Sequence, residues 1–109
     1  MQTECVIVCT TLPANADSGV FGRTLVEERL AACVVTQPGT HSVYRWKNGI
    51  EQADEQQVTI KTTQGRLDQL GERITALHPY DVPELVVIPV VGGSPAYLDW
   101  LRESTSEEA

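Results

Sequence analysis

The sequence predicts a single α+β domain in which strands and helices follow the order β-α-β-β-α-β-α. Two amphipathic stretches, residues 20–32 and 67–77, repeat their apolar side chains at helical spacing. Two apolar runs, residues 5–11 and 85–91, have the length and composition of buried strands. Between them, the Asn48-Gly49 pair separates two stretches of alternating side chains, which is typical of a β-hairpin.

The first third of the chain predicts a strand followed by a helix. Residues 5–11 (Cys-Val-Ile-Val-Cys-Thr-Thr) are apolar and β-branched, which indicates a strand covered on both faces. Asp17 or Ser18 can serve as the N-cap of a helix over residues 20–32. One broad face of that helix carries the apolar residues Phe21, Leu25, Val26 and Leu30.

The middle of the chain predicts a long hairpin. Residues 33–36 have strand character, and Pro38-Gly39 interrupts it as a bulge or kink, because proline cannot donate to a central ladder. Side chains then alternate over residues 41–47 and again over 57–63. Asn48-Gly49 favours a type I′ turn, which needs positive φ at both central residues.

A second helix and a rigid corner follow. Thr63 or Gln64 can cap the helix over residues 67–77. Segment 78–84 (His-Pro-Tyr-Asp-Val-Pro-Glu) contains two prolines, which fix φ and push the preceding residues out of the helical region. We therefore expect the helix to end here and the chain to continue extended into residues 85–91.

Ser94 and Pro95 supply an N-cap and a first-turn proline for a last short helix. The complete order fits a four-stranded antiparallel sheet with two helices packed on one face, the ferredoxin-like arrangement. The C-terminal helix and the long hairpin are additions to it. A domain of this size has a thin core, and a lone two-stranded ribbon is marginal, so we expect the chain to associate with copies of itself.

Composition excludes several functions. A chain of 109 residues is one domain, and its net charge of −7 argues against nucleic acid and anionic membrane as partners. Part of that charge belongs to residues 103–109, which we expect to form a frayed acidic tail. Three cysteines in apolar surroundings indicate reduced thiols, and no stretch resembles a targeting signal, so we expect a cytoplasmic protein.

The corner also carries the groups needed for acid–base chemistry. His78, Asp81 and Glu84 lie close together in sequence, and Lys61 could act as their electrostatic partner. The alternative is structural, with Asp81 bonding backbone N–H groups and Glu84 pairing with a basic side chain. No nucleophile paired with a base is evident, so we expect no enzymatic activity.

The aromatic residues suggest a pocket or an interface. Aromatic walls with a few fixed polar groups form small-ligand sites, and Trp and Tyr are also enriched where subunits meet. Both interpretations concern the same residues: Tyr44, Trp46, Tyr80, Tyr97 and Trp100, together with Lys61, Asp81 and Glu84.

Taken together, these motifs resemble the CutA divalent-cation tolerance family. The resemblance covers nearly the whole chain and implies a ferredoxin-like fold and a homotrimer with extended hairpins. It also implies a role in copper and divalent-cation tolerance. Trimers of similar build among the PII-type signalling proteins bind small metabolites between subunits. The resemblance is carried by residues 28–34, Pro38-Gly39, Ser42, Tyr44, Trp46-Lys47, Lys61-Thr62, segment 78–84, Tyr97-Leu98 and Trp100.

The resemblance also implies a metal site. The copper ligands proposed for the family fall on Cys9 and His78, and thiolate and imidazole are ligands that suit copper. Some members have a second histidine where this chain has Leu77, so we expect copper or another divalent cation to bind only weakly. The structural alternative is a core thiol and a histidine that ends a helix. Three functions stay open: a metal-responsive trimer, a PII-like metabolite sensor and a ligand-free structural trimer.

Overall fold

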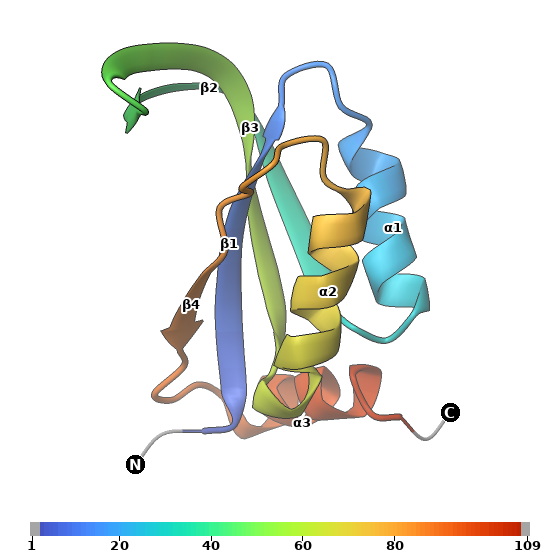
Figure 1. Cartoon of the computed structure of the whole chain (residues 1–109). Helices are drawn as coiled ribbons and strands as arrows, with labels where there is room; N and C mark the ends of the chain where they lie inside the picture. Colours follow the sequence, from blue (N-terminus) through green and yellow to red (C-terminus); the bar gives the residue numbers. More distant parts are fainter. Residues whose placement is uncertain (1–2, 108–109) are drawn as a thin grey trace.

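The structure, a computed structural model, describes residues 3–107. Figure 1 shows a four-stranded sheet with α1 and α2 on one face and α3 across one end. The strand order is β2-β3-β1-β4, and every neighbouring pair is antiparallel. Over residues 3–107, no helix has the length and apolar character needed to cross a membrane. The elements are β1 (Cys5–Pro13), α1 (Ser18–Glu27), β2 (Cys33–Trp46), β3 (Gly49–Thr63), η1 (Gln64–Arg66), α2 (Leu67–Leu77), β4 (Val86–Pro89) and α3 (Pro95–Ser104).

The main core lies between the sheet and helices α1 and α2. Alternate residues of β1 and β3 point towards these helices, as the period of a strand requires. The α+β class and the predicted element order are confirmed. The core consists of Val6, Val8, Leu12, Phe21, Leu25, Leu30, Ala31, Val58, Ile60, Leu70 and Ile74.

Helix α1 is shorter than predicted. Asp17 caps it by accepting a hydrogen bond from the Val20 amide at 3.0 Å, which confirms one of the two expected caps. The helix ends at Glu27 instead of continuing to residue 32, because Arg29 adopts a φ of 61°. This left-handed residue turns the chain back towards the sheet.

The hairpin of β2 and β3 is long and bent. The ladder shifts register between Gln37 and Thr40, and Gly39 has a φ of 76°, which confirms the bulge predicted at this point. Beyond the bulge the two strands leave the plane of the sheet and curve over the side away from the helices (Figure 1). The turn differs from the expected one, since Trp46 pairs with Gly49 and positive φ falls on Lys47.

Segment 78–84 ends α2 as predicted, but the start of α2 and the burial of β4 differ from the prediction. Helix α2 ends at Leu77, and His78 is extended with a ψ of 137°. Neither Thr63 nor Gln64 caps α2, because the one-turn helix η1 precedes it. Strand β4 is apolar but not covered, and half of the Val86 surface is exposed in the single chain.

The last helix continues into the segment predicted as a tail. Helix α3 continues to Ser104, and Thr105 is buried, with its hydroxyl donating to the Leu101 carbonyl at 3.0 Å. Glu107 forms an ion pair with Arg66 at 3.0 Å. Helix α3 thus extends two residues into the segment predicted as a frayed tail from residue 103, and residues 108–109 of that segment lie outside the described residues.

Candidate functional site

Within residues 3–107, one face of the sheet has no helix layer over it. Helices α1 and α2 cover the opposite face, so side chains that alternate with the core residues of β1 point away from them. Val86 pairs with Cys9, Ile88 with Ile7, and Val35 with Thr59, which places them on this face. We call Ile7, Cys9, Val35, Val86 and Ile88 the open face. Contiguous exposed apolar residues of this kind mark interaction sites.

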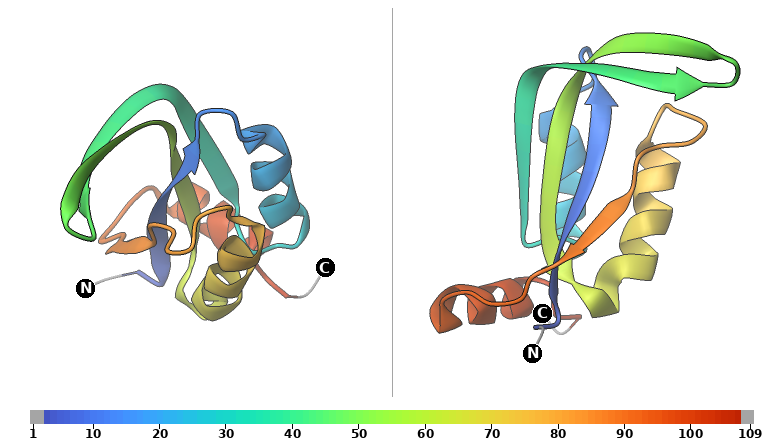
Figure 2. Two further views of the ribbon diagram at one scale, coloured as in Figure 1. Left: turned by 45° about the horizontal axis from the view of Figure 1, so that its top comes forward. Right: turned by 90° about the vertical axis from the view of Figure 1, so that its left-hand side faces the viewer.

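A pocket lies between the bent hairpin and the corner. Figure 2 shows the hairpin passing above the loop that joins α2 to β4. The space between them has a volume of about 750 Å³. We call it the corner pocket. It is lined by Thr11 of β1, by Ser42, Val43, Tyr44, Trp46 and Glu55 of the hairpin, and by residues 79–84 of the corner.

Glu55 and Tyr80 connect the two walls of the corner pocket. The Tyr80 hydroxyl donates to Glu55 Oε2 at 2.8 Å. Glu55 is only 5% exposed, so this carboxylate lies inside the protein and not on its surface. Burial of the phenol, together with its hydrogen bond to Glu55, raises the pKa of Tyr80 to about 12. Tyr80 therefore stays protonated and holds the corner to the hairpin.

Both ring nitrogens of His78 are occupied. The ring accepts the Tyr80 amide at Nδ1 (3.1 Å) and faces the Thr11 carbonyl with Nε2 at 2.5 Å. Since a carbonyl only accepts, Nε2 must carry the proton, and the ring is the neutral Nε2–H tautomer. The ring also packs against that of Tyr80, with centroids 4.8 Å apart. His78 thus fixes the corner to β1.

The two copper ligands implied by the family resemblance do not form a metal site within one chain. Cys9 is a free, half-buried thiol on the open face, whereas His78 has no ring nitrogen to spare. Nowhere in residues 3–107 do three or more His, Cys, Asp or Glu side chains gather closely enough to hold a metal ion. Leu77, at the end of α2, adds no donor. The donor set of this chain therefore does not fit a copper site built on His78.

The remaining predicted site residues fall into two groups. Tyr44, Trp46, Tyr80, Asp81 and Glu84 all line the corner pocket. The other three, Lys61, Tyr97 and Trp100, meet at the start of α3. There the Lys61 ammonium donates to the Tyr97 hydroxyl at 3.4 Å and lies 5.5 Å from the centre of its ring. The Tyr97 and Trp100 rings are 5.2 Å apart.

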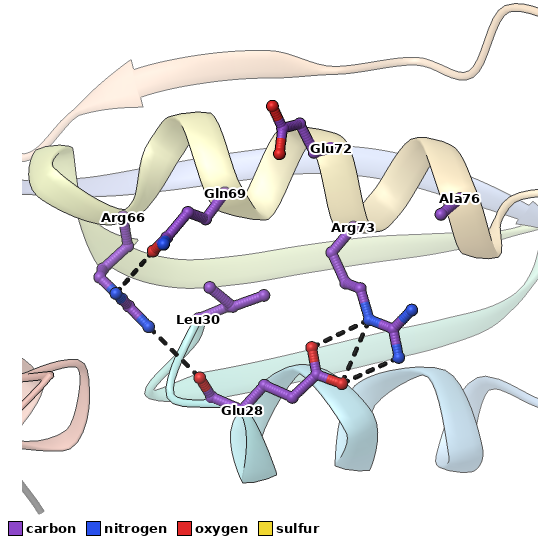
Figure 3. Close-up of a pocket in the computed structure, with 7 residues that line it drawn as sticks. All are labelled: Glu28, Leu30, Arg66, Gln69, Glu72, Arg73 and Ala76. Atoms are coloured by element: carbon purple, nitrogen blue, oxygen red, sulfur yellow. Dashed lines mark hydrogen bonds and ion pairs between the residues drawn. The ribbon is translucent and has the colours of Figure 1, made fainter.

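Sequence reasoning missed Glu55 and Arg66. The predicted alternation of side chains over residues 57–63 could have been continued two residues back, to Glu55. It would then have placed Glu55 on the side of β3 that belongs to the open face. No pattern in the sequence indicated a role for Arg66. It lines a smaller pocket between α1 and α2, where Arg73 also forms a bidentate ion pair with Glu28 (Figure 3). The Arg66 guanidinium donates to the Glu28 and Arg29 carbonyls at the end of α1.

These features define an α+β protein with an exposed apolar sheet face and a pocket lined by aromatic and acidic residues. A family model described as CutA1 divalent ion tolerance protein matches residues 6–104. The chain belongs to this CutA family, as the His-Pro-Tyr-x-x-Pro-Glu block of segment 78–84 predicts.

Individual relatives agree with this assignment. The divalent-cation tolerance protein CutA of Thermus thermophilus is 46% identical over 99 residues, which are 91% of this chain and 96% of that protein. The chloroplastic protein CutA of Arabidopsis thaliana is 41% identical, and the match covers 92% of this chain and 55% of the plant protein. The crystal structure of CutA from Xylella fastidiosa has a TM-score of 0.91 at 38% identity, and the match covers 95% of this chain and 100% of that one.

Proposed function

We propose that this protein is a homotrimer of the ferredoxin-like type that takes part in divalent-cation tolerance. The antiparallel order β4-β1-β3-β2, with α1 and α2 on one face, supports this topology. The names of the relatives support the role. The observation that carries the proposal is the open face. Apolar side chains of β4 and β2 remain exposed there unless another copy covers them.

The hairpin supports the same assembly. Its outer half extends past the sheet, and Val43 and Ile50 in it are largely exposed in the single chain. A ribbon of two strands is marginal in water without a surface to pack on. Neighbouring subunits would supply that surface for both the hairpin and the open face.

Light scattering with a matched pair of variants tests the assembly. The unmodified protein should have three times the 12.0 kDa mass of one chain. Val86→Asp places a charge on the open face and should give monomers. Val20→Asp makes the same change at an exposed position on α1 and should leave the trimer intact. A monomer mass for the unmodified protein at micromolar concentration would contradict the proposal.

Copper is the first metal to test, and we expect it to bind weakly. The Cys9 thiol is a soft donor without a competing partner among the described residues, whereas the His78 ring would have to give up two hydrogen bonds. Calorimetric titration of the metal-free protein should show weak binding that Cys9→Ser removes. Cys33→Ser, which changes another half-buried thiol, is the control. Tight binding that survives Cys9→Ser would place the metal elsewhere.

The corner pocket favours a second candidate function. Its aromatic walls, buried carboxylate and volume of about 750 Å³ suit a small molecule better than a bare ion. The protein would then be a PII-like module in which ligand binding near the subunit boundary is passed to a partner. Titration with a panel of small molecules tests this role, and saturable binding to one of them would support it.

We further propose that the protein is cytoplasmic and is not an enzyme. The three cysteines are free thiols, as expected in a reducing compartment. The imidazole at the corner is held by the Thr11 carbonyl and the Tyr80 amide, which makes it a structural group and not a base. Fractionation of cells and an assay for hydrolysis of ester and phosphate substrates test these two points.

A further inference from the structure

Glu55 is a buried carboxylate with unused bonding capacity. It lies on β3 where the hairpin leaves the sheet, and its Oε2 accepts a hydrogen bond from Tyr80. Among the described residues, no side chain or amide donates to Oε1, and no lysine or arginine pairs with the carboxylate. No fully buried side-chain oxygen in residues 3–107 lacks a partner, so Oε1 must reach the space of the corner pocket. A carboxylate in this position calls for a donor from outside the chain.

The charged residues that line the corner pocket are all acidic. Asp81 and Glu84 stand on its wall formed by the corner, and Glu55 lies at its buried end. Among the described residues that line it there is no lysine or arginine. Three carboxylates around one concave space attract cations, and the low-dielectric walls strengthen that attraction.

The remaining walls suit an organic cation. Tyr44 and Trp46 extend from the hairpin, and Tyr80 comes from the corner. Aromatic faces attract ammonium groups and also cover the methylene groups attached to them. A bare metal ion is the weaker alternative, because no three carboxylates, imidazoles or thiols in the described part of the chain lie close enough to coordinate one.

We propose that the corner pocket binds a small aliphatic ammonium compound, with one N–H⁺ group donating to Glu55 Oε1. A diamine fits best, because its second ammonium group can reach Asp81 or Glu84 at the mouth while its chain lies against Tyr44 and Trp46. This inference rests on the proposed ligand-binding role of the corner pocket. It adds the chemical class of the ligand.

Calorimetry on the assembled protein tests the proposal with four probes: a diamine, a monoamine, a carboxylate and a nucleotide. These are 1,4-diaminobutane, 1-aminobutane, butanoate and adenosine triphosphate, each titrated at low and at physiological salt. We expect 1,4-diaminobutane to bind with one site per chain, 1-aminobutane to bind more weakly, and the two anions not to bind. Zinc and magnesium chloride are added as competitors, which should not displace the diamine.

Two variants with one control locate the site. Glu55→Gln keeps the shape and the acceptor for Tyr80 but removes the charge, and should weaken diamine binding by about tenfold or more. Glu51→Gln removes an equal charge from an exposed position on the same strand, outside the pocket, and should change binding less than about twofold. Asp81→Asn, at an exposed position, gives a second test if Glu55→Gln does not fold, and should weaken binding by about twofold to fivefold.

The possible outcomes distinguish a wrong ligand class from a wrong binding role for the corner pocket. Diamine binding that Glu55→Gln weakens and Glu51→Gln spares supports the ammonium site. Binding of adenosine triphosphate or butanoate in place of the diamine overturns the ligand class but keeps a binding role for the corner pocket. Displacement of the diamine by zinc overturns it in favour of a metal. If no probe binds, both the class and the binding role of the corner pocket are wrong.

Discussion

Arg66→Ala should be among the most destabilising single changes in this chain. The side chain is nearly buried, and its guanidinium donates to four oxygens: the Glu28 and Arg29 carbonyls, Gln69 Oε1 and Glu107 Oε1. Two of these are the last carbonyls after α1, which otherwise have no donor among the described residues. One arginine therefore ties the end of α1 to the start of α2 and to the C-terminal segment.

The four contacts do not contribute equally. The Glu107 carboxylate is 75% exposed, so its ion pair with Arg66 is worth only about 0–1 kcal/mol. The two carbonyls lose a charged donor, and each would cost about 1–3 kcal/mol if left dry. Water entering the adjoining pocket offsets part of this loss. The expected total is about 2–4 kcal/mol in the free energy of unfolding.

Urea unfolding at fixed protein concentration measures this loss, because the proposed association would make the midpoint depend on concentration. Arg73→Ala is the matched control. Its bidentate pair with Glu28 is exposed by more than a third on both sides, so it should cost less than about 1 kcal/mol. Equal losses in the two variants would refute the argument that the buried carbonyls make the difference.

Three other changes test separate contacts. Tyr80→Phe removes the hydroxyl that donates to the buried Glu55 carboxylate, and thermal unfolding should show a loss of about 1–3 kcal/mol. Gly39→Ala, at a φ of 76°, should cost about 1 kcal/mol in the same assay. The hydrogen bond from His41 to Asp54 raises the His41 pKa above 6.5, so its stabilising contribution should be complete below that pH and disappear as pH rises through the raised value. NMR titration should show the raised pKa, and Asp54→Asn should return it towards 6.5.

The elements could be predicted because their signals are local. Periodicity placed α2 at residues 67–77, two prolines fixed where it ends, and Pro38-Gly39 marked the bulge. The end of α1 could not be predicted in this way. Arg29 turns the chain with positive φ while its side chain donates to the Glu103 and Ser104 carbonyls, more than 70 residues away. No window of sequence contains that contact.

The same limit applies to the site. Aromatic residues and the corner carboxylates were predicted to share a pocket or an interface, but only the bend of the hairpin decides which ones meet. It brings Tyr44 and Trp46 to the corner and leaves Tyr97 and Trp100 near Lys61 at α3. Burial of Glu55 depends on Tyr80, 25 residues further along the chain. A charged residue in a polar strand gives no sign of that burial.

The hairpin would link the proposed assembly to the proposed ligand binding. Tyr44 and Glu55 of the hairpin form walls of the corner pocket. Ile50, on the same outer part of the hairpin, is largely exposed in the single chain, where a second copy would pack in the proposed trimer. Any ligand that fixes the hairpin would lower the cost of ordering it in the proposed trimer, and by reciprocity that trimer would bind the ligand more tightly. Val86→Asp should therefore weaken diamine binding although Val86 does not line the corner pocket. Saturating diamine should in turn raise the midpoint of trimer dissociation, and equal diamine affinity in trimer and monomer would show that the hairpin holds its position without a neighbour.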